Sequence, residues 1–173
     1  TPIKSSAASD VYKRQTLLFK SPTCTEDDKL AAKDLASIAN IDVEKYGLEM
    51  LKAGTDLSDL TELELINLDA KEVMLKNSKA IIAQVNTASI EDMMKRKDKI
   101  EEEMKKVIEE KNLDIFFFAI TDIINSNSQA IVLGKKAYIT ESAYNVKLEN
   151  NTAFLKGVVS RKKQIIPVLM EQE

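Results

Sequence analysis

Histidine is absent from the 173 residues, and cysteine occurs once, as Cys24. The missing imidazole excludes a histidine general base, a Ser-His-Asp triad and a histidine-ligated metal within this chain. The single thiol excludes an internal disulfide and a multi-cysteine metal site, and it fits a reducing, cytoplasmic location. Any metal site must therefore use oxygen ligands alone or be supplied by other sequence.

Long apolar runs and an excess of positive charge are also missing. No apolar stretch approaches the roughly 18 residues of a membrane span, and the formal net charge is −3. This balance argues against a membrane segment and against a broad nucleic-acid-binding face. Apolar residues make up 44% and charged residues 31% of the chain, a composition that can bury a core.

The pattern of apolar residues predicts an α/β fold, with a mixed sheet of about four to five strands flanked by helices and preceded by two helices. The first two helices are predicted to start at Thr25 and after the cap Asp42, and Leu30, Ala31, Leu35 and Ile38 should form the buried stripe of the first. The elements predicted after them are a brief helix within 60–68, a hairpin of strands 72–75 and 80–85, a helix over 89–111, a central strand over 113–120, a strand over 129–133, a helix over 137–144 and an edge strand over 146–148.

Two further features of the sequence, a polar stretch at the end of a strand and a proline near the end of the chain, lead to expectations about a ligand-facing edge and about the closing element. Asp122, Asn125, Ser126 and Asn127 collect where a strand ends, an edge that often faces ligand in α/β sheets. A polar turn whose side chains bond the local backbone is an equally good interpretation. Pro167 is expected to loosen the closing element, because it restricts the residue before it.

A cluster of positive charge stands out near the end of the chain. Arg161, Lys162 and Lys163 lie between two short apolar runs, Val158-Val159 and Ile165-Ile166. We expect these four apolar residues to anchor the segment in a core. Arginine offers a planar fork of donors and lysine a compact charge, which together suit a phosphate group. The alternative, a solvated basic turn, is the more frequent meaning of charge alone.

Four segments in order carry a resemblance to a known family: residues 16–25, residues 83–86, residues 121–126, and the stretch Gly157-Val158-Val159-Ser160-Arg161-Lys162-Lys163-Gln164. Their sequence and spacing resemble those of family II inorganic pyrophosphatases, the manganese-dependent, two-domain members of the DHH phosphoesterase superfamily. The resemblance runs from Thr16 to about Pro167. It implies that the chain is a C-terminal fragment of such an enzyme.

The resemblance also implies a domain organisation. Residues 16–54 correspond to the end of the DHH catalytic domain, residues 55–59 to a linker, and residues 60–173 to the DHH-associated C-terminal substrate-binding domain. Residues 1–15 show neither helical nor strand periodicity and resemble a translated adapter sequence, so we expect them to be non-native.

In this family pyrophosphate lies between the two domains, and hydrolysis yields two phosphates. The resemblance implies that Arg161 and Lys162 grip phosphate, and that Lys71, 90 positions before Arg161, is a third contact. Three neighbours, Ser160, Lys163 and Gln164, would support these cations without being catalytic. Such cations stabilise the charge that builds up on the transferred phosphoryl oxygens.

The metal site belongs to the other domain of the family. Manganese, or cobalt or magnesium, is held there, and the position of one family aspartate ligand is occupied here by Gln15. We therefore expect no catalytic residue and no metal in this chain, no turnover by the chain alone, and a homodimer only through the other domain.

Two alternatives stay open. The chain can belong to another DHH-superfamily phosphoesterase, an exopolyphosphatase or nucleotide phosphoesterase, or it can be a non-catalytic anion-binding module.

Overall fold

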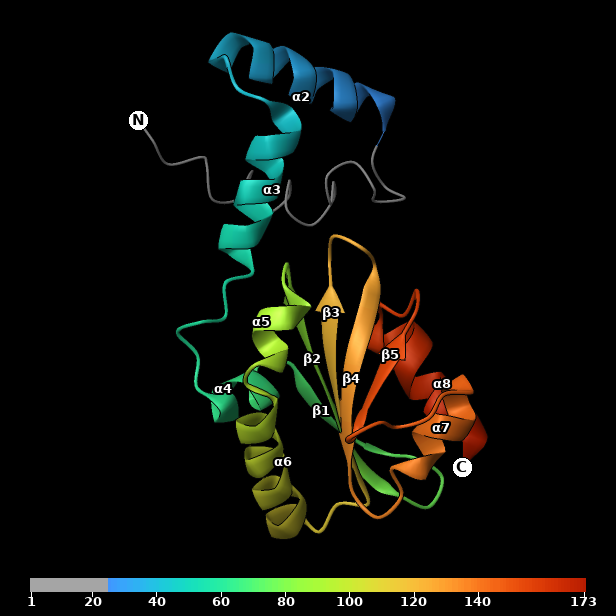
Figure 1. Cartoon of the computed structure of the whole chain (residues 1–173). Helices are drawn as coiled ribbons and strands as arrows, with labels where there is room; N and C mark the ends of the chain where they lie inside the picture. Colours follow the sequence, from blue (N-terminus) through green and yellow to red (C-terminus); the bar gives the residue numbers. More distant parts are fainter. Residues whose placement is uncertain (1–24) are drawn as a thin grey trace. The chain divides into compact units, whose positions relative to one another are not determined.

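The computed structural model describes residues 25–173, so the predictions for residues 1–24, including the substitution at Gln15, lie outside the described part. The chain divides between Asp56 and Leu57 into two units. Figure 1 draws both, and each is described by itself.

The described part of the first unit consists of two helices, as the sequence predicts. They are α2 (Glu26–Ala39) and α3 (Val43–Gly54). Asp42 caps α3, because its side-chain oxygen accepts from the amide of Lys45 at 2.8 Å. A cap of this kind satisfies one of the amides that a helix start leaves without a partner.

The predicted buried stripe of α2 is wrong. Leu30, Leu35 and Ile38 are 59%, 66% and 83% exposed, whereas Ala32 and Ala36 are buried. Helical spacing identifies an apolar face, but it carries no information on what covers that face.

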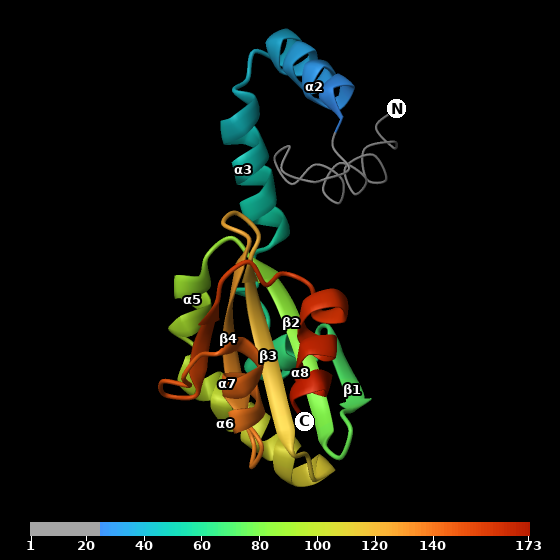
Figure 2. The ribbon, with the colours of Figure 1, turned by 90° about the vertical axis from the view of Figure 1, so that its right-hand side faces the viewer.

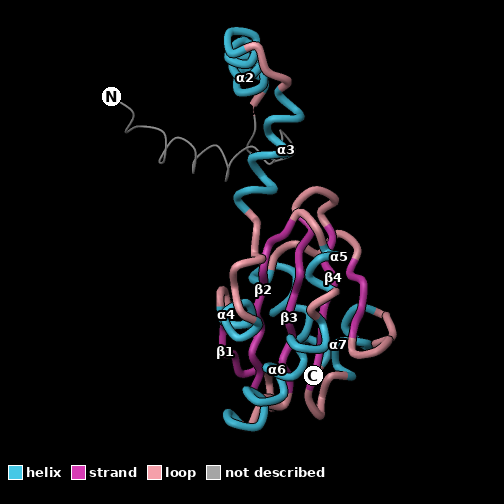
Figure 3. Tube along the Cα trace, turned by 60° about the vertical axis from the view of Figure 1, so that its left-hand side comes forward, coloured by secondary structure: helices cyan, strands magenta, loops and turns pink. Residues whose placement is uncertain are grey.

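The second unit contains a five-stranded sheet in the order β1-β2-β3-β4-β5. Strands β2 and β3 are parallel and the other neighbours are antiparallel, so the predicted mixed sheet is confirmed. The strands are β1 (Ala70–Met74), β2 (Lys79–Thr87), β3 (Ile115–Asp122), β4 (Asn127–Leu133) and β5 (Thr152–Leu155). Figure 3 shows the strands β1 to β4 crossing the unit side by side.

Helices cover both faces of the sheet. On one face lie α4 (Glu62–Asn67), α5 (Ile90–Met94) and α6 (Lys97–Lys111), and on the other lie α7 (Tyr138–Tyr144) and α8 (Ile166–Gln172). Figure 2 shows α7 and α8 in front of the strands and α6 behind them. The first core includes Ile66, Ile100, Met104, Phe116 and Phe118, and the second includes Ile82, Phe117, Val132, Ile165 and Leu169.

The long helix predicted over 89–111 is interrupted. It forms α5 and α6, with a break at Lys95 and Arg96. The guanidinium of Arg96 pairs with Glu62 at 3.1 Å and donates to the carbonyl of Leu57 at 3.1 Å. These contacts bind the residues at the break to the segment that leads into α4. Helical spacing cannot reveal such a tertiary partner. Ser89 does cap α5, as predicted.

The polar stretch after β3 is a turn. The side chain of Asp122 accepts from the amides of Ile124 and Asn125 at 2.8 and 3.0 Å, and β3 and β4 pair directly on either side. The local backbone bonds of the polar-turn interpretation are thus present at Asp122, and a ligand-facing role of this edge stays a prediction.

The predicted edge strand over 146–148 is wrong. The amide of Val146 bonds the carbonyl of Glu141 at 3.1 Å, and the amide of Leu148 bonds the side chain of Glu141 at 2.8 Å. The backbone there is thus tied to α7, and β5 forms the edge instead.

Pro167 lies in the first turn of α8, directly after a wider π-helical turn over Arg161–Ile165. The closing element is therefore helical on both sides of Pro167, and its change from π-helical to α-helical geometry comes immediately before the proline. That Pro167 loosens this element stays a prediction.

Within residues 25–173, every helix is too short or too polar to cross a bilayer.

Candidate functional site

The basic cluster begins a helical segment. Arg161–Ile165 form a π-helical turn, η1, that continues directly into α8. Ser160 precedes this turn with an extended backbone, and its hydroxyl oxygen accepts from the amide of Lys163 at 3.3 Å. The hydroxyl of Ser160 therefore caps the turn.

Two of the four predicted apolar anchors are buried. Val158 and Ile165 lie in the core, Ile166 is half-buried, and Val159 is exposed. In an extended segment neighbouring side chains point to opposite sides, so only one of the two valines faces the core. One buried anchor on each side, Val158 and Ile165, still fixes the position of the cluster against the core.

Gln164 closes the loop that precedes η1. Its side-chain oxygen accepts from the amides of Val159 and Ser160 at 3.0 and 3.1 Å, and its side-chain nitrogen donates to the carbonyl of Gly157 at 2.8 Å. Its own carbonyl accepts from the hydroxyl of Tyr144 at 2.8 Å, and burial raises the pKa of that hydroxyl. Gln164 thus shapes the loop that carries the cations.

The guanidinium of Arg161 lies over the start of β1 and the middle of β2. Its Nη2 is 2.7 Å from Oδ1 of Asp69, and its Nη1 donates to the carbonyl of Asp69 and, at 3.5 Å, to that of Ile82. The side chain is only 20% exposed. A guanidinium has five N–H donors, and these contacts use three, so donors remain for a bound anion.

Lys71 lies on the same face of the same strand pair. It is opposite Ile82 in the β1–β2 register, and directly paired residues share a face of a sheet. Ile82 belongs to the core beneath α8, and its carbonyl is the one that Arg161 approaches. The fold therefore brings Lys71 and Arg161 to one face at the β1 edge.

The remaining lysines of the cluster are less constrained. Lys162 and Lys163 are exposed on η1, beside the better buried Arg161. With Lys71 and Arg161 they make four cations, of which Arg161 is paired with the carboxylate of Asp69, in a chain whose net charge is negative. The local excess of positive charge suits a compact polyanion.

Sequence reasoning missed Gln84, Thr121 and Ser128, which bond the loop or one another. Asn127, which the sequence did single out, accepts at its Oδ1 from the amide of Gly157 at 2.9 Å. Gln84 and Thr121 both lie in segments that carry the family resemblance. The resemblance was the one signal in the sequence that pointed to these two residues. Their role could not be predicted from it, because it depends on hydrogen-bond partners far away in the sequence.

The cationic site does not fit manganese. Lys71, Arg161 and Lys162 present positive charge and N–H donors, whereas divalent manganese takes oxygen or imidazole ligands. No group of three or more metal-binding side chains gathers anywhere in residues 25–173. The metal implied by the resemblance therefore has no ligands at this site.

The sequence matches the DHHA2 domain over residues 48–172. The chain belongs to the DHHA2 domain family. This match covers the whole sheet and both layers of helices described above, including Lys71 and the η1 cluster.

Whole proteins that contain a similar segment are named as pyrophosphatases. The chain is 59% identical over 156 residues to the manganese-dependent inorganic pyrophosphatase of Bacillus subtilis, and 60% identical over the same length to a "Probable manganese-dependent inorganic pyrophosphatase" of Bacillus velezensis. Each alignment covers 90% of this chain and 50% of the relative. The DHHA2 chain thus spans about half the length of these relatives.

A solved structure agrees with these sequences. A Methanococcus jannaschii protein classed as a family II inorganic pyrophosphatase aligns with a TM-score of 0.69 and 40% identity. The alignment covers 91% of this chain and 51% of that one. The resemblance to family II pyrophosphatases seen in the sequence is confirmed.

Proposed function

We propose that this chain supplies the substrate-binding half of a manganese-dependent inorganic pyrophosphatase, which hydrolyses pyrophosphate to two phosphates. In this proposal Arg161, Lys162 and Lys71 bind the phosphate oxygens. The metal ligands and the activated water come from outside residues 25–173. The relatives support this assignment, because they carry that activity in their names and match the chain over half their length.

The observation that carries the proposal is that Lys71 and Arg161 lie over the same part of the sheet. Their positions are 90 residues apart, yet they share one face of the β1–β2 pair. A solvated basic turn has no need of a distant lysine beside it. A polyanion does, because its charge is spread over several oxygens and each cation stabilises only those nearby.

The arrangement assigns different tasks to the cations. The fork of Arg161 can bind two phosphate oxygens at once, while Lys71 and Lys162 act as point charges. Phosphoryl transfer depends mainly on positioning and on cations aimed at the oxygens where charge develops. The side chains of this chain therefore bind and orient the substrate and stabilise its charge, and Gln164 holds the loop in shape.

A titration of the purified chain with pyrophosphate, followed by two-dimensional NMR, tests the proposal. We expect a dissociation constant of about 1 mM that rises with added salt, because the contacts are ionic and Lys71 and Lys162 are exposed. Arg161→Ala should weaken binding by roughly tenfold, the worth of a charge-assisted hydrogen bond, and Lys71→Ala should weaken it less.

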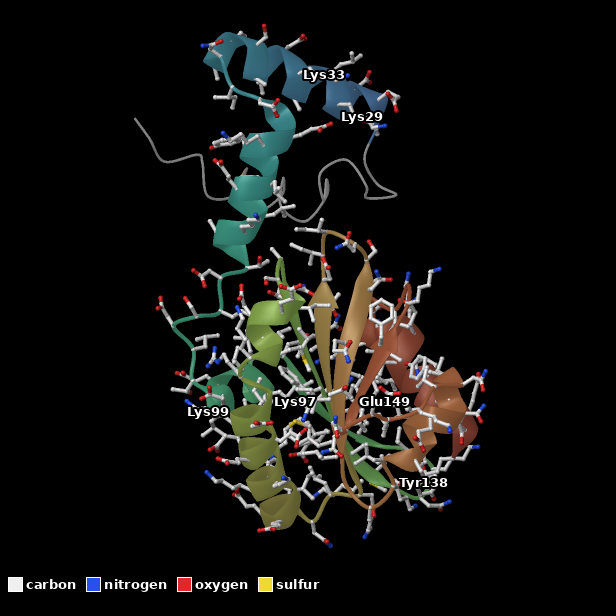
Figure 4. All side chains as sticks on the ribbon, viewed as in Figure 1. Lys29, Lys33, Lys97, Lys99, Tyr138 and Glu149 are labelled. Atoms are coloured by element: carbon white, nitrogen blue, oxygen red, sulfur yellow. The ribbon has the colours of Figure 1, made fainter. Side chains whose placement is uncertain are left out.

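Lys99→Ala is the matched control. Lys99 is exposed on the outer side of α6, away from the sheet (Figure 4), so its loss removes the same charge elsewhere. Equal effects of Lys99→Ala and Arg161→Ala would mean that the affinity depends on the net charge alone, and would refute the site. Tighter binding of polyphosphate or a nucleotide than of pyrophosphate would instead indicate another DHH phosphoesterase.

The proposal extends to activity, location and assembly. The chain alone should not turn over pyrophosphate with manganese, cobalt or magnesium, because it has no histidine and no metal ligands at its site. Measurable turnover would contradict this. We place the complete enzyme in the cytoplasm, without nucleic-acid or membrane partners, and expect any homodimer to form through sequence beyond this domain.

A further inference from the structure

We propose that Gln84 is a positioning residue of the pyrophosphate site: its side-chain amide fixes the backbone of Arg161 and thereby the place from which the guanidinium reaches the substrate. The inference rests on the function proposed above, since it assigns Arg161 to phosphate. Gln84 itself is not expected to contact the ligand.

All the hydrogen-bonding groups of the Gln84 amide are in use. Its oxygen accepts from the amide of Arg161 at 3.1 Å. Its nitrogen donates to the carbonyl of Val159 at 3.0 Å and to the hydroxyl of Thr121 at 2.8 Å. One acceptor and two donors match an amide and no other side chain of this size. The amide therefore joins β2, β3 and both sides of Ser160.

Two buried hydroxyl groups, those of Thr121 and Ser128, continue the hydrogen bonding from this amide to the loop. The hydroxyl oxygens of Thr121 and Ser128 are 2.8 Å apart, and Ser128 donates to the carbonyl of Val158 at 2.7 Å. Both hydroxyl residues are buried. These hydrogen bonds run across β2, β3 and β4 and end on the same loop, so the backbone of residues 158–161 is bound to three strands. Fully satisfied buried networks of this kind hold one geometry.

The guanidinium of Arg161 is held at the far end of its side chain. Its contacts are the side chain and carbonyl of Asp69, just before β1, and the carbonyl of Ile82, within β2. With the backbone held by Gln84 and the fork held by Asp69, the flexible arginine side chain is confined before any ligand arrives. The entropy cost of ordering it then falls on folding and not on binding.

The change Gln84→Met tests this role. Methionine keeps the length of the side chain and removes all three hydrogen bonds. We expect the affinity for pyrophosphate to fall about tenfold and hydrogen exchange at the Arg161 amide to speed up by a similar factor. Gln84→Glu should also weaken binding, because a carboxylate still accepts from Arg161 but faces the carbonyl of Val159 without a proton to donate.

Gln129→Met is the matched control. Gln129 is also half-buried, but it lies on β4 opposite Ile120, whose side chain belongs to the other core. Gln129→Met should leave both the affinity and the Arg161 exchange unchanged. Melting temperatures of the variants, together with exchange at Ile100 in the remote core, separate a local loss from global unfolding.

Three outcomes decide the question. Weaker binding with faster exchange at Arg161 and unchanged exchange at Ile100 supports the positioning role. Affinity within twofold of the wild type in Gln84→Met overturns it, as does a loss shared equally by Gln129→Met. If the wild-type chain binds no pyrophosphate, the proposed function fails, and exchange at the Arg161 amide still decides: unchanged protection in Gln84→Met overturns the role of Gln84 as well.

Discussion

Arg161 forms an ion pair with Asp69, 92 positions earlier in the chain, with 2.7 Å between Nη2 and Oδ1. Asp69 immediately precedes β1, which carries Lys71, so one short stretch of chain offers a carboxylate and an ammonium group to the site. The carboxylate holds the arginine fork at the β1 edge. It also occupies donors that phosphate oxygens would otherwise take, so it competes with an anionic ligand.

The change Asp69→Asn should therefore raise the affinity of the chain for pyrophosphate by about two- to fivefold, the modest range expected when an exposed ion pair is removed. Calorimetric or NMR titration measures it. Asp98→Asn, on an exposed carboxylate of α6, is the control for the same change in net charge. Weaker binding in Asp69→Asn would mean that orientation of the arginine matters more than competition.

The carboxylate of Glu173 should make stability depend on pH. Its side chain is 5% exposed and bonds Ser78, Lys136 at 2.9 Å and the amide of Asn77 at 3.0 Å. Burial alone would raise the pKa, but these hydrogen bonds and the charge of Lys136 together hold the pKa of Glu173 below its ordinary value.

A lowered folded-state pKa means that the stabilisation is complete above the ordinary pKa and is lost as the pH falls through the folded value. We expect Glu173→Gln to cost about 1 kcal/mol at neutral pH, a difference that shrinks as the pH falls from about 5 towards 3. Denaturant melts at several pH values measure it. Glu171→Gln, at an exposed position in the last turn of α8, should show no such trend. A pH-independent difference for Glu173→Gln would contradict the linkage.

Two glycines with positive φ should respond differently to alanine. At Gly134, with φ of +115°, a Cβ would lie 2.3 Å from the carbonyl oxygen of Asp114, whereas at Gly157, with φ of +73°, it would meet no atom within 4 Å. Gly157→Ala should cost about 1 kcal/mol from backbone strain, and Gly134→Ala clearly more, because the clash with backbone adds to the strain. Equal losses in denaturant melts would contradict the close approach at Gly134.

The central strand should carry much of the stability. Phe117 is fully buried in β3, and Phe117→Ala is expected to cost about 3–5 kcal/mol. Phe154 on β5 is 54% exposed, and Phe154→Ala should change the free energy of unfolding by no more than about 0.5 kcal/mol. A loss below about 1 kcal/mol for Phe117→Ala would show that the strand is not central.

Much of the fold was predictable because its signals are local. The continuous apolar run that became β3 predicts a strand covered on both faces, and the short connection before Ala80 predicts the first hairpin. Elements whose form depends on remote contacts were not predictable. The break at Arg96 follows from Glu62 and Leu57, and the segment after Tyr144 is tied to Glu141 where a strand was expected.

The sequence by itself determined the α/β class and the family resemblance, and it proposed the cations of the site, because apolar periodicity and motif spacing are written along the chain. Only the tertiary structure decided that Asp69 occupies the fork of Arg161 and that Gln84 holds its backbone. These contacts join residues 92 and 77 positions apart. Hydrogen bonds form between groups within about 3 Å, and no local pattern encodes which distant residues the folded sheet brings that close.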